Sequence, residues 1–287
     1  MSKANARVVV LTSFLPNFQL LASWAERHGH QIPLVVTPPG GSGHYGGGEL
    51  SAGLGKGVSL LVTGKLRTVA APLIAALAPD LVISAAFPRL IPSEILTIPT
   101  YGAVNLHPSV LPAGRGPNPL RLLYEGAETI GATLHRTEAE FDTGAVLSQR
   151  ERPLPERLSG PSVLNSWSDM FAEVIEEGTA RALAGEPGLV QDSTRASYMP
   201  PFSDEERVLD FTEPAATISR KVAALNVLVP RALTRLPGCE GTVLHVEVLP
   251  STGRSAGTVV AAHPDGCTVQ TADLAVRVTV ERGSSRG

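Results

Sequence analysis

The sequence predicts an α/β fold, in which a mostly parallel sheet carries helices on its faces and a small β-domain follows at the C-terminus. Stretches typical of strands and of helices alternate through the first half of the chain. Val, Leu and Ala supply most of the apolar residues, and aromatic residues make up only 5%, which is typical of aliphatic strands buried between helices. Short strands separated by turn residues close the chain, as in a small barrel or sandwich.

The elements of the first half follow from their residue patterns. Residues 7–12 form an aliphatic run suited to a buried strand, and residues 20–28 place Leu20, Leu21 and Trp24 on one face of a helix. Further strands are expected at residues 32–37, 80–85, 104–107 and 130–137, and a further helix at residues 68–77. This alternation predicts a parallel sheet with right-handed connections, whose ligands bind where the strands end.

The segment that follows the second strand is rich in glycine. Residues 38–48 read Pro-Pro-Gly-Gly-Ser-Gly-His-Tyr-Gly-Gly-Gly, which is too glycine-rich to hold a regular element. They match neither a phosphate-binding P-loop nor a dinucleotide-binding turn. We interpret residues 40–48 as a surface loop, with a loop that gates the substrate as the alternative.

The composition changes again at residues 185–202, where Gly and Pro interrupt a polar stretch. This stretch predicts a linker between a catalytic domain at residues 1–184 and a C-terminal domain at residues 203–287. The C-terminal domain is expected to hold a helix at residues 204–226 and strands at residues 242–249, 257–262, 267–271 and 274–280.

Charge, hydropathy and cysteine content limit the function classes. The formal net charge of -3 gives no general attraction toward nucleic acid or anionic lipid. No segment approaches the roughly 18–20 apolar residues of a membrane span, and no secretory signal is recognisable, so we expect a cytoplasmic protein with no membrane partner. A bridge between Cys239 and Cys267 is conceivable, but we expect two free, packed thiols. No zinc-type spacing surrounds them, and we expect no metal.

The motif that carries chemistry lies at residues 104–120. Asn105 and His107 are two residues apart in a short strand, so their side chains leave the same face. Four prolines then restrain the exit loop, while Gly114 and Gly116 permit sharp turns. A rigid loop at the carboxyl end of a strand is where an α/β enzyme would place a preorganised site.

An acidic residue, Asp142, follows a later strand in a Phe-Asp-Thr-Gly turn. Asn, His and Asp together suit acyl transfer to an amine without a covalent intermediate. The amide of Asn105 can donate a hydrogen bond to the oxyanion of a tetrahedral intermediate, and His107 can take the proton that the amine loses. The carboxylate of Asp142 can orient the imidazole and favour its charged form.

Residues 105–120, with residues 142–144 beyond them, resemble the signature N-x-H-x-S-x-L-P-x-x-R-G and the later Asp-x-Gly turn of the 10-formyltetrahydrofolate-dependent formyltransferases. The resemblance implies a Rossmann-like formyltransferase fold, 10-formyltetrahydrofolate as co-substrate, and Asn105, His107 and Asp142 as catalytic residues. It also implies a folate pocket and a supporting loop. The folate-binding residues would be Phe87, Arg89, Leu90, Ile91, Glu138, Glu140 and Phe141, and the supporting loop would contain Ser109, Leu111, Pro112, Arg115 and Gly116.

The C-terminal part is similar to that of the methionyl-tRNA formyltransferases, where this domain is a small open barrel. Residues 203–206 and 209–211 resemble its opening, although the usual Asn-Pro-Trp-Pro turn reads Asn-Val-Leu-Val-Pro at residues 226–230. Those enzymes normally carry a basic loop after the second strand, where this chain has residues 40–48. Residues 203–287 contain nine Lys and Arg against ten Asp and Glu, which offers little for binding phosphates.

Residues near the motif also bear on the identity of the formyl acceptor. Residues 131–136, Gly-Ala-Thr-Leu-His-Arg, and Asn118 resemble relatives that formylate amino sugars or hydroxylated ornithine side chains. We therefore favour a small-molecule amine, such as an amino sugar, an amino acid or a hydroxyornithine-type side chain. Methionyl-tRNA is the alternative. A hydrolase that releases formate from 10-formyltetrahydrofolate, or a non-catalytic folate-binding relative, is the second alternative.

Overall fold

The computed structural model describes residues 5–40 and 47–281, which form two compact units. The first unit comprises Met1–Pro117, Gly131–Arg152 and Trp167–Tyr198, and the second comprises Asn118–Ile130, Pro153–Ser166 and Met199–Gly287. Each unit is therefore assembled from separate stretches of the chain. The domain boundary expected at residues 185–202 stays a prediction.

Nearly all of a seven-stranded sheet belongs to the first unit, with the order β3-β2-β1-β4-β5-β6-β7. The strands are β1 (Arg7–Thr12), β2 (Gln31–Thr37), β3 (Ser59–Val62), β4 (Leu81–Ala85), β5 (Ala103–His107), β6 (Thr129–Arg136) and β7 (Val146–Pro153). The first five are mutually parallel, which confirms the mostly parallel α/β sheet, but β6 runs antiparallel to β5. The connection between them, residues 108–128, holds only the five-residue helix α5 (Leu120–Tyr124).

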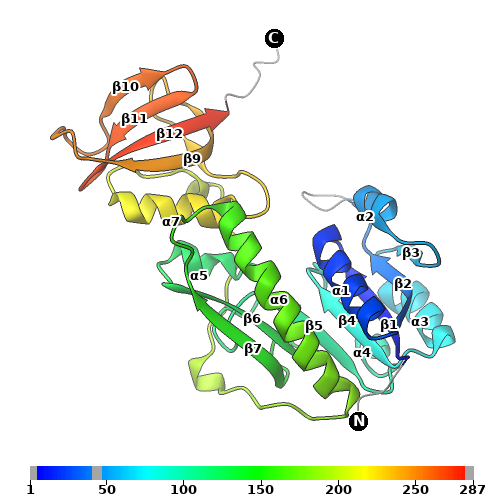
Figure 1. Ribbon diagram of the computed structural model, residues 1–287. Helices are drawn as coiled ribbons and strands as arrows, with labels where there is room; N and C mark the ends of the chain where they lie inside the picture. The colour runs from blue at the N-terminus through cyan, green and yellow to red at the C-terminus, as the bar shows by residue number, and fades with distance from the viewer. Residues whose placement is uncertain (1–4, 41–46, 282–287) are drawn as a thin grey trace. The chain divides into compact units, whose positions relative to one another are not determined.

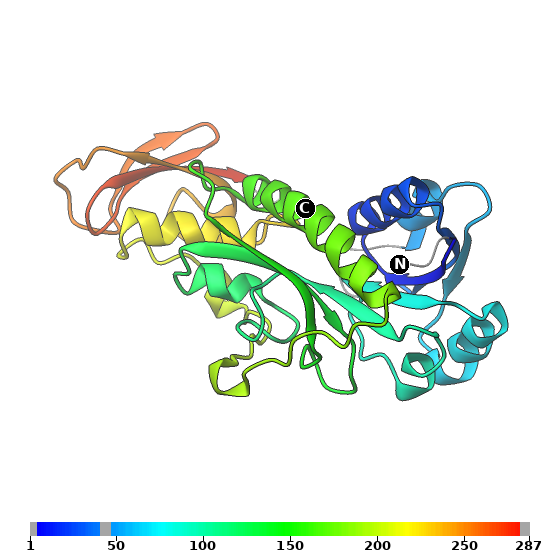
Figure 2. The same ribbon diagram turned by 60° about the horizontal axis from the view of Figure 1, so that its bottom comes forward.

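Helices cover both faces of this sheet. Helix α1 (Leu15–Arg27) and the part of α6 (Gly160–Leu183) in this unit lie on one face, and α3 (Ala71–Leu77) and α4 (Ser93–Leu96) lie on the other (Figures 1 and 2). Aliphatic strand residues such as Val9 and Val36 pack against Ile74 of α3 in a buried cluster. The carboxyl ends of the parallel strands are thereby left to the loops.

Several helices differ from the sequence-based expectation. Helix α1 begins five residues early, because Pro16 in its first turn is compatible with a helix start. The helix expected at residues 68–77 begins as a π-helical turn, Leu66–Ala70, before α3. Helix α2 (Gly47–Gly53) includes the last two glycines of the segment expected to hold no regular element, so that expectation is wrong there. Residues 41–46 lie outside the described residues, and the long helix α6 was not predicted.

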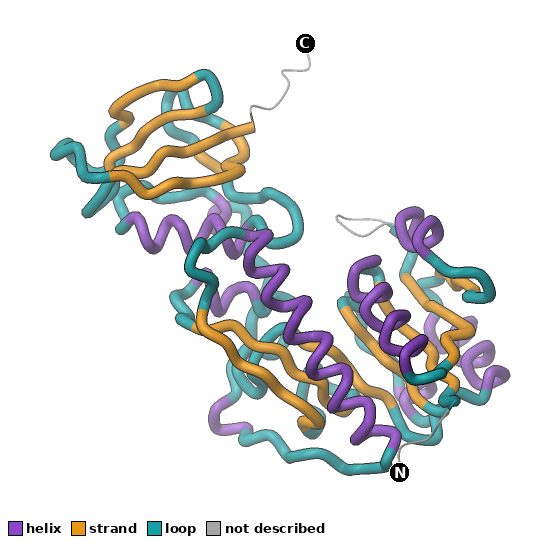
Figure 3. Tube along the Cα trace, viewed as in Figure 1, coloured by secondary structure: helices purple, strands orange, loops and turns teal. Residues whose placement is uncertain are grey.

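The second unit contains an antiparallel sheet of order β10-β11-β12-β9-β8, against which α7 packs (Figure 3). Its elements are α7 (Ala215–Leu225), β8 (Leu233–Thr234), β9 (Gly241–Leu249), β10 (Val259–His263), β11 (Gly266–Gln270) and β12 (Ala275–Glu281). The helix expected at residues 204–226 is wrong in its first part, which holds only the 3-10 turn Glu205–Arg207. Pro214 sets the true start, because it lies in extended backbone directly before α7.

Cys239 and Cys267 form a disulfide in the core of this unit, with Cα atoms 5.9 Å apart. The expectation of two free thiols is therefore wrong. The sheet brings the two residues together although they are 28 positions apart in the sequence. Within residues 5–40 and 47–281, no helix combines the length and the hydropathy needed to cross a membrane.

Candidate active site

Strand β5 presents Asn105 and His107 at its carboxyl end, as the sequence predicts. Val104 and Leu106 alternate with them and are buried in the protein core, so the two polar side chains share the opposite face. The antiparallel register places His135 of β6 directly opposite Asn105, and Thr133 opposite His107. A second pair of polar side chains therefore lies beside the predicted pair.

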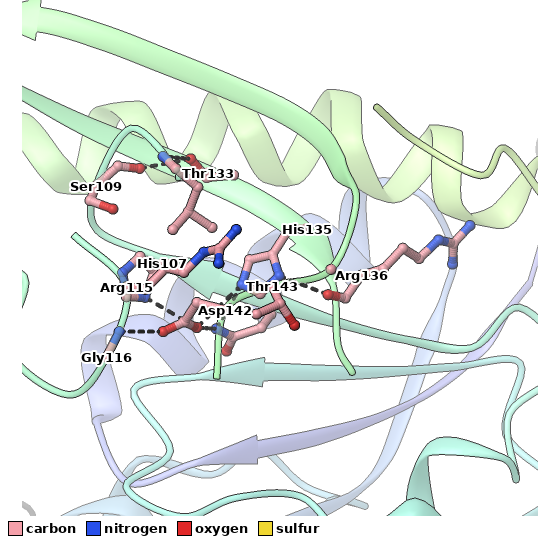
Figure 4. A network of polar contacts seen from close by, with 12 residues as sticks. His107, Ser109, Arg115, Gly116, Thr133, His135, Arg136, Asp142 and Thr143 are labelled. Carbon is pink, nitrogen blue, oxygen red and sulfur yellow. Dashed lines mark hydrogen bonds and ion pairs between the residues drawn. The ribbon is translucent and has the colours of Figure 1, made fainter. Parts of the chain in front are cut away.

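Asp142 lies next to Asn105 and His107, in the turn after β6, and Figure 4 shows it beside His107. Its Oδ1 accepts a hydrogen bond from Nδ2 of Asn105 at 3.2 Å, and its Oδ2 accepts one from the backbone N–H of Gly116 at 2.8 Å. The backbone of Asp142 is left-handed, with φ of 56°, a conformation that Asp and Asn tolerate better than most residues. The turn thus delivers the carboxylate to the end of β5.

His107 is buried, and each of its ring nitrogens faces an oxygen atom. Nε2 lies 2.7 Å from the carbonyl oxygen of Gly114, and Nδ1 lies 3.5 Å from Oδ1 of Asp142. A carbonyl only accepts hydrogen bonds, so we assign the proton of the neutral ring to Nε2. Nδ1 is then the nitrogen that can take up a proton, on the side of Asp142.

The surroundings shift the pKa values of this pair. Burial lowers the pKa of His107, and the charge of Asp142 acts in the opposite direction. Burial also works against ionisation of Asp142, but the nearby imidazole of His107 and the backbone N–H of Gly116 act in the opposite direction, and the pKa of Asp142 is lowered to about 2. A neutral imidazole and an ionised carboxylate therefore stand side by side at neutral pH.

The loop after β5 is fastened by its own hydrogen bonds. The hydroxyl of Ser109 donates to the carbonyl of Ala113 at 2.7 Å. The hydroxyl of Thr133 donates to the carbonyl of Ser109 at 2.7 Å (Figure 4). Leu111 and Pro112 are joined by a cis peptide bond. Gly116 has φ of 100°, and a Cβ there would meet the ring of Tyr198 at 2.5 Å, so only glycine fits. Ser109 holds the loop and does not face Asp142.

Gln191 connects the Asp142 turn to the Arg115 loop, and the sequence did not reveal it. Its Nε2 donates to the carbonyls of Asp142 at 2.8 Å and Gly144 at 2.7 Å. Its Oε1 accepts from Nε of Arg115 at 3.1 Å and from Nη2 at 2.8 Å. Gln191 lies at residues 185–202, which the sequence predicts to be a linker, and no sequence motif there indicates a role in the site.

Gln191→Met is expected to lower kcat roughly tenfold, because two buried carbonyls of the Asp142 turn lose their donor. Gln191→Glu should lower it as well, since a carboxylate can still bind Arg115 but cannot donate to the turn. Steady-state kinetics and thermal unfolding of both variants measure this. Wild-type kcat in the Met variant would show that the turn does not need Gln191.

The residues expected to bind folate divide into two groups. Leu90, Glu140 and Phe141 line a cavity of about 480 Å³ next to the Asp142 turn. Its other lining residues are Arg115, Ala139, Thr143, Ala196, Ser197 and Tyr198. Among the described residues, Phe87, Arg89, Ile91 and Glu138 lie outside this lining. The side chain of Ile91 is buried in the protein core, so only its backbone can face a ligand.

Comparisons with known proteins identify relatives of this chain. Residues 65–174 match the formyl transferase family, and residues 201–283 match the formyl transferase C-terminal domain. The methionyl-tRNA formyltransferase of Janthinobacterium sp. (strain Marseille) is 32% identical over 286 residues, which cover 92% of this chain and 89% of that protein.

Two solved structures share the fold. HypX from Aquifex aeolicus in complex with tetrahydrofolic acid has a TM-score of 0.73 at 22% identity, covering 96% of this chain and 43% of that one. A sugar N-formyltransferase from Shewanella sp FDAARGOS_354 has a TM-score of 0.65 at 16% identity, covering 88% and 99%.

Proposed function

Because the chain belongs to the formyltransferases that use 10-formyltetrahydrofolate, we propose that it transfers the formyl group to the amine of a small molecule. The observation that supports this acceptor is the charge of residues 203–287, whose nine basic and ten acidic residues offer little for binding the phosphates of RNA. The cavity of about 480 Å³ beside Asp142 has the size of a small-ligand site, and three of its lining residues are among those expected to bind the folate. Phe141 and Tyr198 expose 43% and 57% of their surfaces there, which suits the flat pteridine ring.

The charge of the chain agrees better with a small acceptor than with RNA. Residues 203–287 are close to neutral, with nine basic and ten acidic residues. RNA affinity at physiological salt depends on several Lys or Arg residues that neutralise phosphates. The half-buried Arg121 forms an ion pair with Glu206 at 2.6 Å. Lys221 forms an ion pair with Glu213 at 2.6 Å. These cations are therefore committed to intramolecular pairs.

Methionyl-tRNA is the second candidate acceptor. It is supported by the relative from Janthinobacterium, which bears that name and is similar to this chain over both the catalytic and the C-terminal parts. The shared domain plan favours methionyl-tRNA as the acceptor. The near-neutral charge of residues 203–287 argues against it.

The chain supplies three roles in this proposal. The co-substrate provides the formyl group, and the amine nitrogen forms a bond to its carbon while the bond to the folate nitrogen breaks. Asn105 donates an N–H to the formyl oxygen as negative charge develops. Nδ1 of His107 takes the proton from the amine and returns it to the departing folate nitrogen. Asp142 stabilises the imidazolium in between, since its Oδ1 lies 3.5 Å from Nδ1.

A direct comparison of acceptors tests the proposal. Purified protein and 10-formyltetrahydrofolate are mixed with charged initiator tRNA or with a panel of amino sugars, amino acids and hydroxyornithine. We expect kcat/KM for one small amine to exceed that for tRNA at least about tenfold, measured by tetrahydrofolate release. Faster transfer to tRNA would overturn the proposed acceptor, and release with water alone would identify a hydrolase.

A further inference from the structure

His135 is a buried histidine that none of these roles uses. It lies on β6 directly opposite Asn105, and its side chain is 1% exposed. Its ring stands edge-on to that of His107, with the centroids 6.3 Å apart. A second imidazole this close to the reacting groups must either disturb them or help to arrange them.

The hydrogen bonds of His135 indicate which ring nitrogen carries its proton. Nδ1 lies 2.7 Å from the carbonyl oxygen of Arg136, which can only accept, so we assign the hydrogen of the neutral ring to Nδ1. Nε2 is then an acceptor, and it lies 3.1 Å from Nδ2 of Asn105. The neutral ring of His135 therefore accepts one N–H of the Asn105 amide.

This contact determines how the Asn105 amide is oriented. Its second N–H donates to Oδ1 of Asp142 at 3.2 Å, so both hydrogens are engaged before a substrate binds. The reversed amide would turn its oxygen toward two acceptors, Nε2 of His135 and Oδ1 of Asp142. His135 and Asp142 together therefore hold the nitrogen in place.

One of these two contacts can be given up during the reaction. When His107 gains a proton at Nδ1, its new N–H points toward Oδ1 of Asp142, 3.5 Å away. The carboxylate then has a donor in place of Asn105, and Nδ2 can turn one N–H to the formyl oxygen. No other donor replaces Asn105 at Nε2 of His135, so the hydrogen bond between Asn105 and His135 persists.

We propose that His135 is a positioning residue of formyl transfer. Its neutral Nε2 holds one N–H of Asn105, which orients the other N–H to pass from Asp142 to the formyl oxygen as His107 takes the proton of the amine. No proton moves through His135, and Asn105 only exchanges one acceptor for another. The proposal rests on the role proposed for Asn105.

The charged groups around His135 make its neutral form important. His107 faces it from β5 and Asp142 from the turn, 3.5 Å from Nε2. The guanidinium of Arg136 is occupied elsewhere, by the carbonyls of Tyr101 and Glu186. A protonated His135 would direct an N–H at Nδ2 of Asn105, which is itself a donor, and the amide would lose its anchor.

Two substitutions of matched purpose test the proposal. His135→Phe keeps the ring but removes both nitrogens, and we expect kcat to fall about tenfold while KM for 10-formyltetrahydrofolate stays within about twofold. His135→Gln keeps an acceptor near the position of Nε2, and its kcat should stay within about threefold of the wild-type value. The assay uses 10-formyltetrahydrofolate with the fastest acceptor of the panel, or with water if no acceptor reacts.

The same two substitutions in the Asn105→Ala background separate positioning from a general loss of structure. There we expect each to change kcat by less than about twofold, because the group that His135 orients is gone. Wild-type kcat in His135→Phe, or a Gln variant as slow as the Phe variant, would overturn the proposal. So would an undiminished effect in the Asn105→Ala background.

A further variant covers the case in which His135→Phe does not fold. His135→Asn keeps a donor near the carbonyl of Arg136 but has no acceptor near Asn105, so we expect its kcat to fall about tenfold as well. Wild-type kcat in His135→Asn would overturn the proposal. Full turnover in Asn105→Ala alone would instead refute the role of Asn105. A slow Asn105→Ala with a fast His135→Phe would refute only the positioning role.

Discussion

Asn105→Ala is expected to lower kcat by roughly 100-fold or more, while the affinity for 10-formyltetrahydrofolate stays nearly unchanged. The substitution removes the N–H that we assign to the formyl oxygen in the transition state. It leaves the loops that carry Leu90 and Phe141 in the cavity lining untouched. Single-turnover kinetics and a fluorescence titration with the folate measure the two quantities separately.

Loss of turnover has to be separated from loss of structure, because Ala also removes a donor from both Asp142 and His135. Thermal unfolding of the variant reports the structural part. Asn165→Ala is the matched control, since this exposed residue of α6 undergoes the same change far along the chain from the motif. Wild-type kcat in Asn105→Ala would remove this amide from the mechanism.

The placement of Asn105 and His107 on one face of β5 could be predicted because its information is local. Asn105 and His107 are two positions apart in one strand, and the prolines and glycines that shape the next loop follow directly. Asp142 could be added because its turn belongs to the same family signature. His135 and Gln191 could not be identified in this way. Their roles depend on the antiparallel register of β5 and β6 and on hydrogen bonds across 49 positions of the chain.

The fold shows the same division between local and distant information. Aliphatic runs identified β1, β2, β4 and β5 to within one or two residues, since a buried strand has a strong local pattern. The sequence did not indicate that β6 would be the antiparallel strand, and the expectation of free thiols at Cys239 and Cys267 was wrong, because both features depend on which strands become neighbours. Which strands pair in a sheet cannot be predicted from the local sequence of any one strand.

Asp142→Asn is expected to lower kcat on the order of 100-fold or more, because the imidazolium formed during transfer loses its charged partner. The pKa of Asp142 is about 2, so the carboxylate that the substitution removes is ionised at every pH where activity is measured. Its charge raises the pKa of His107 against the effect of burial. Without that charge the pKa of His107 falls further, so the acid limb of the kcat profile should move to lower pH.

The substitution keeps one contact of Asp142 and loses another, because the amide nitrogen that replaces Oδ1 cannot accept from Nδ2 of Asn105. The introduced amide suits the left-handed backbone, at φ of 56°, and its oxygen can still accept from the N–H of Gly116. Asp169→Asn is the control, because it removes the same charge from an exposed position of α6 and should leave the profile in place. If Asp142→Asn is slow but keeps the wild-type pH profile, the carboxylate is not the electrostatic partner of His107, and its task is to hold Asn105 and Gly116 in place.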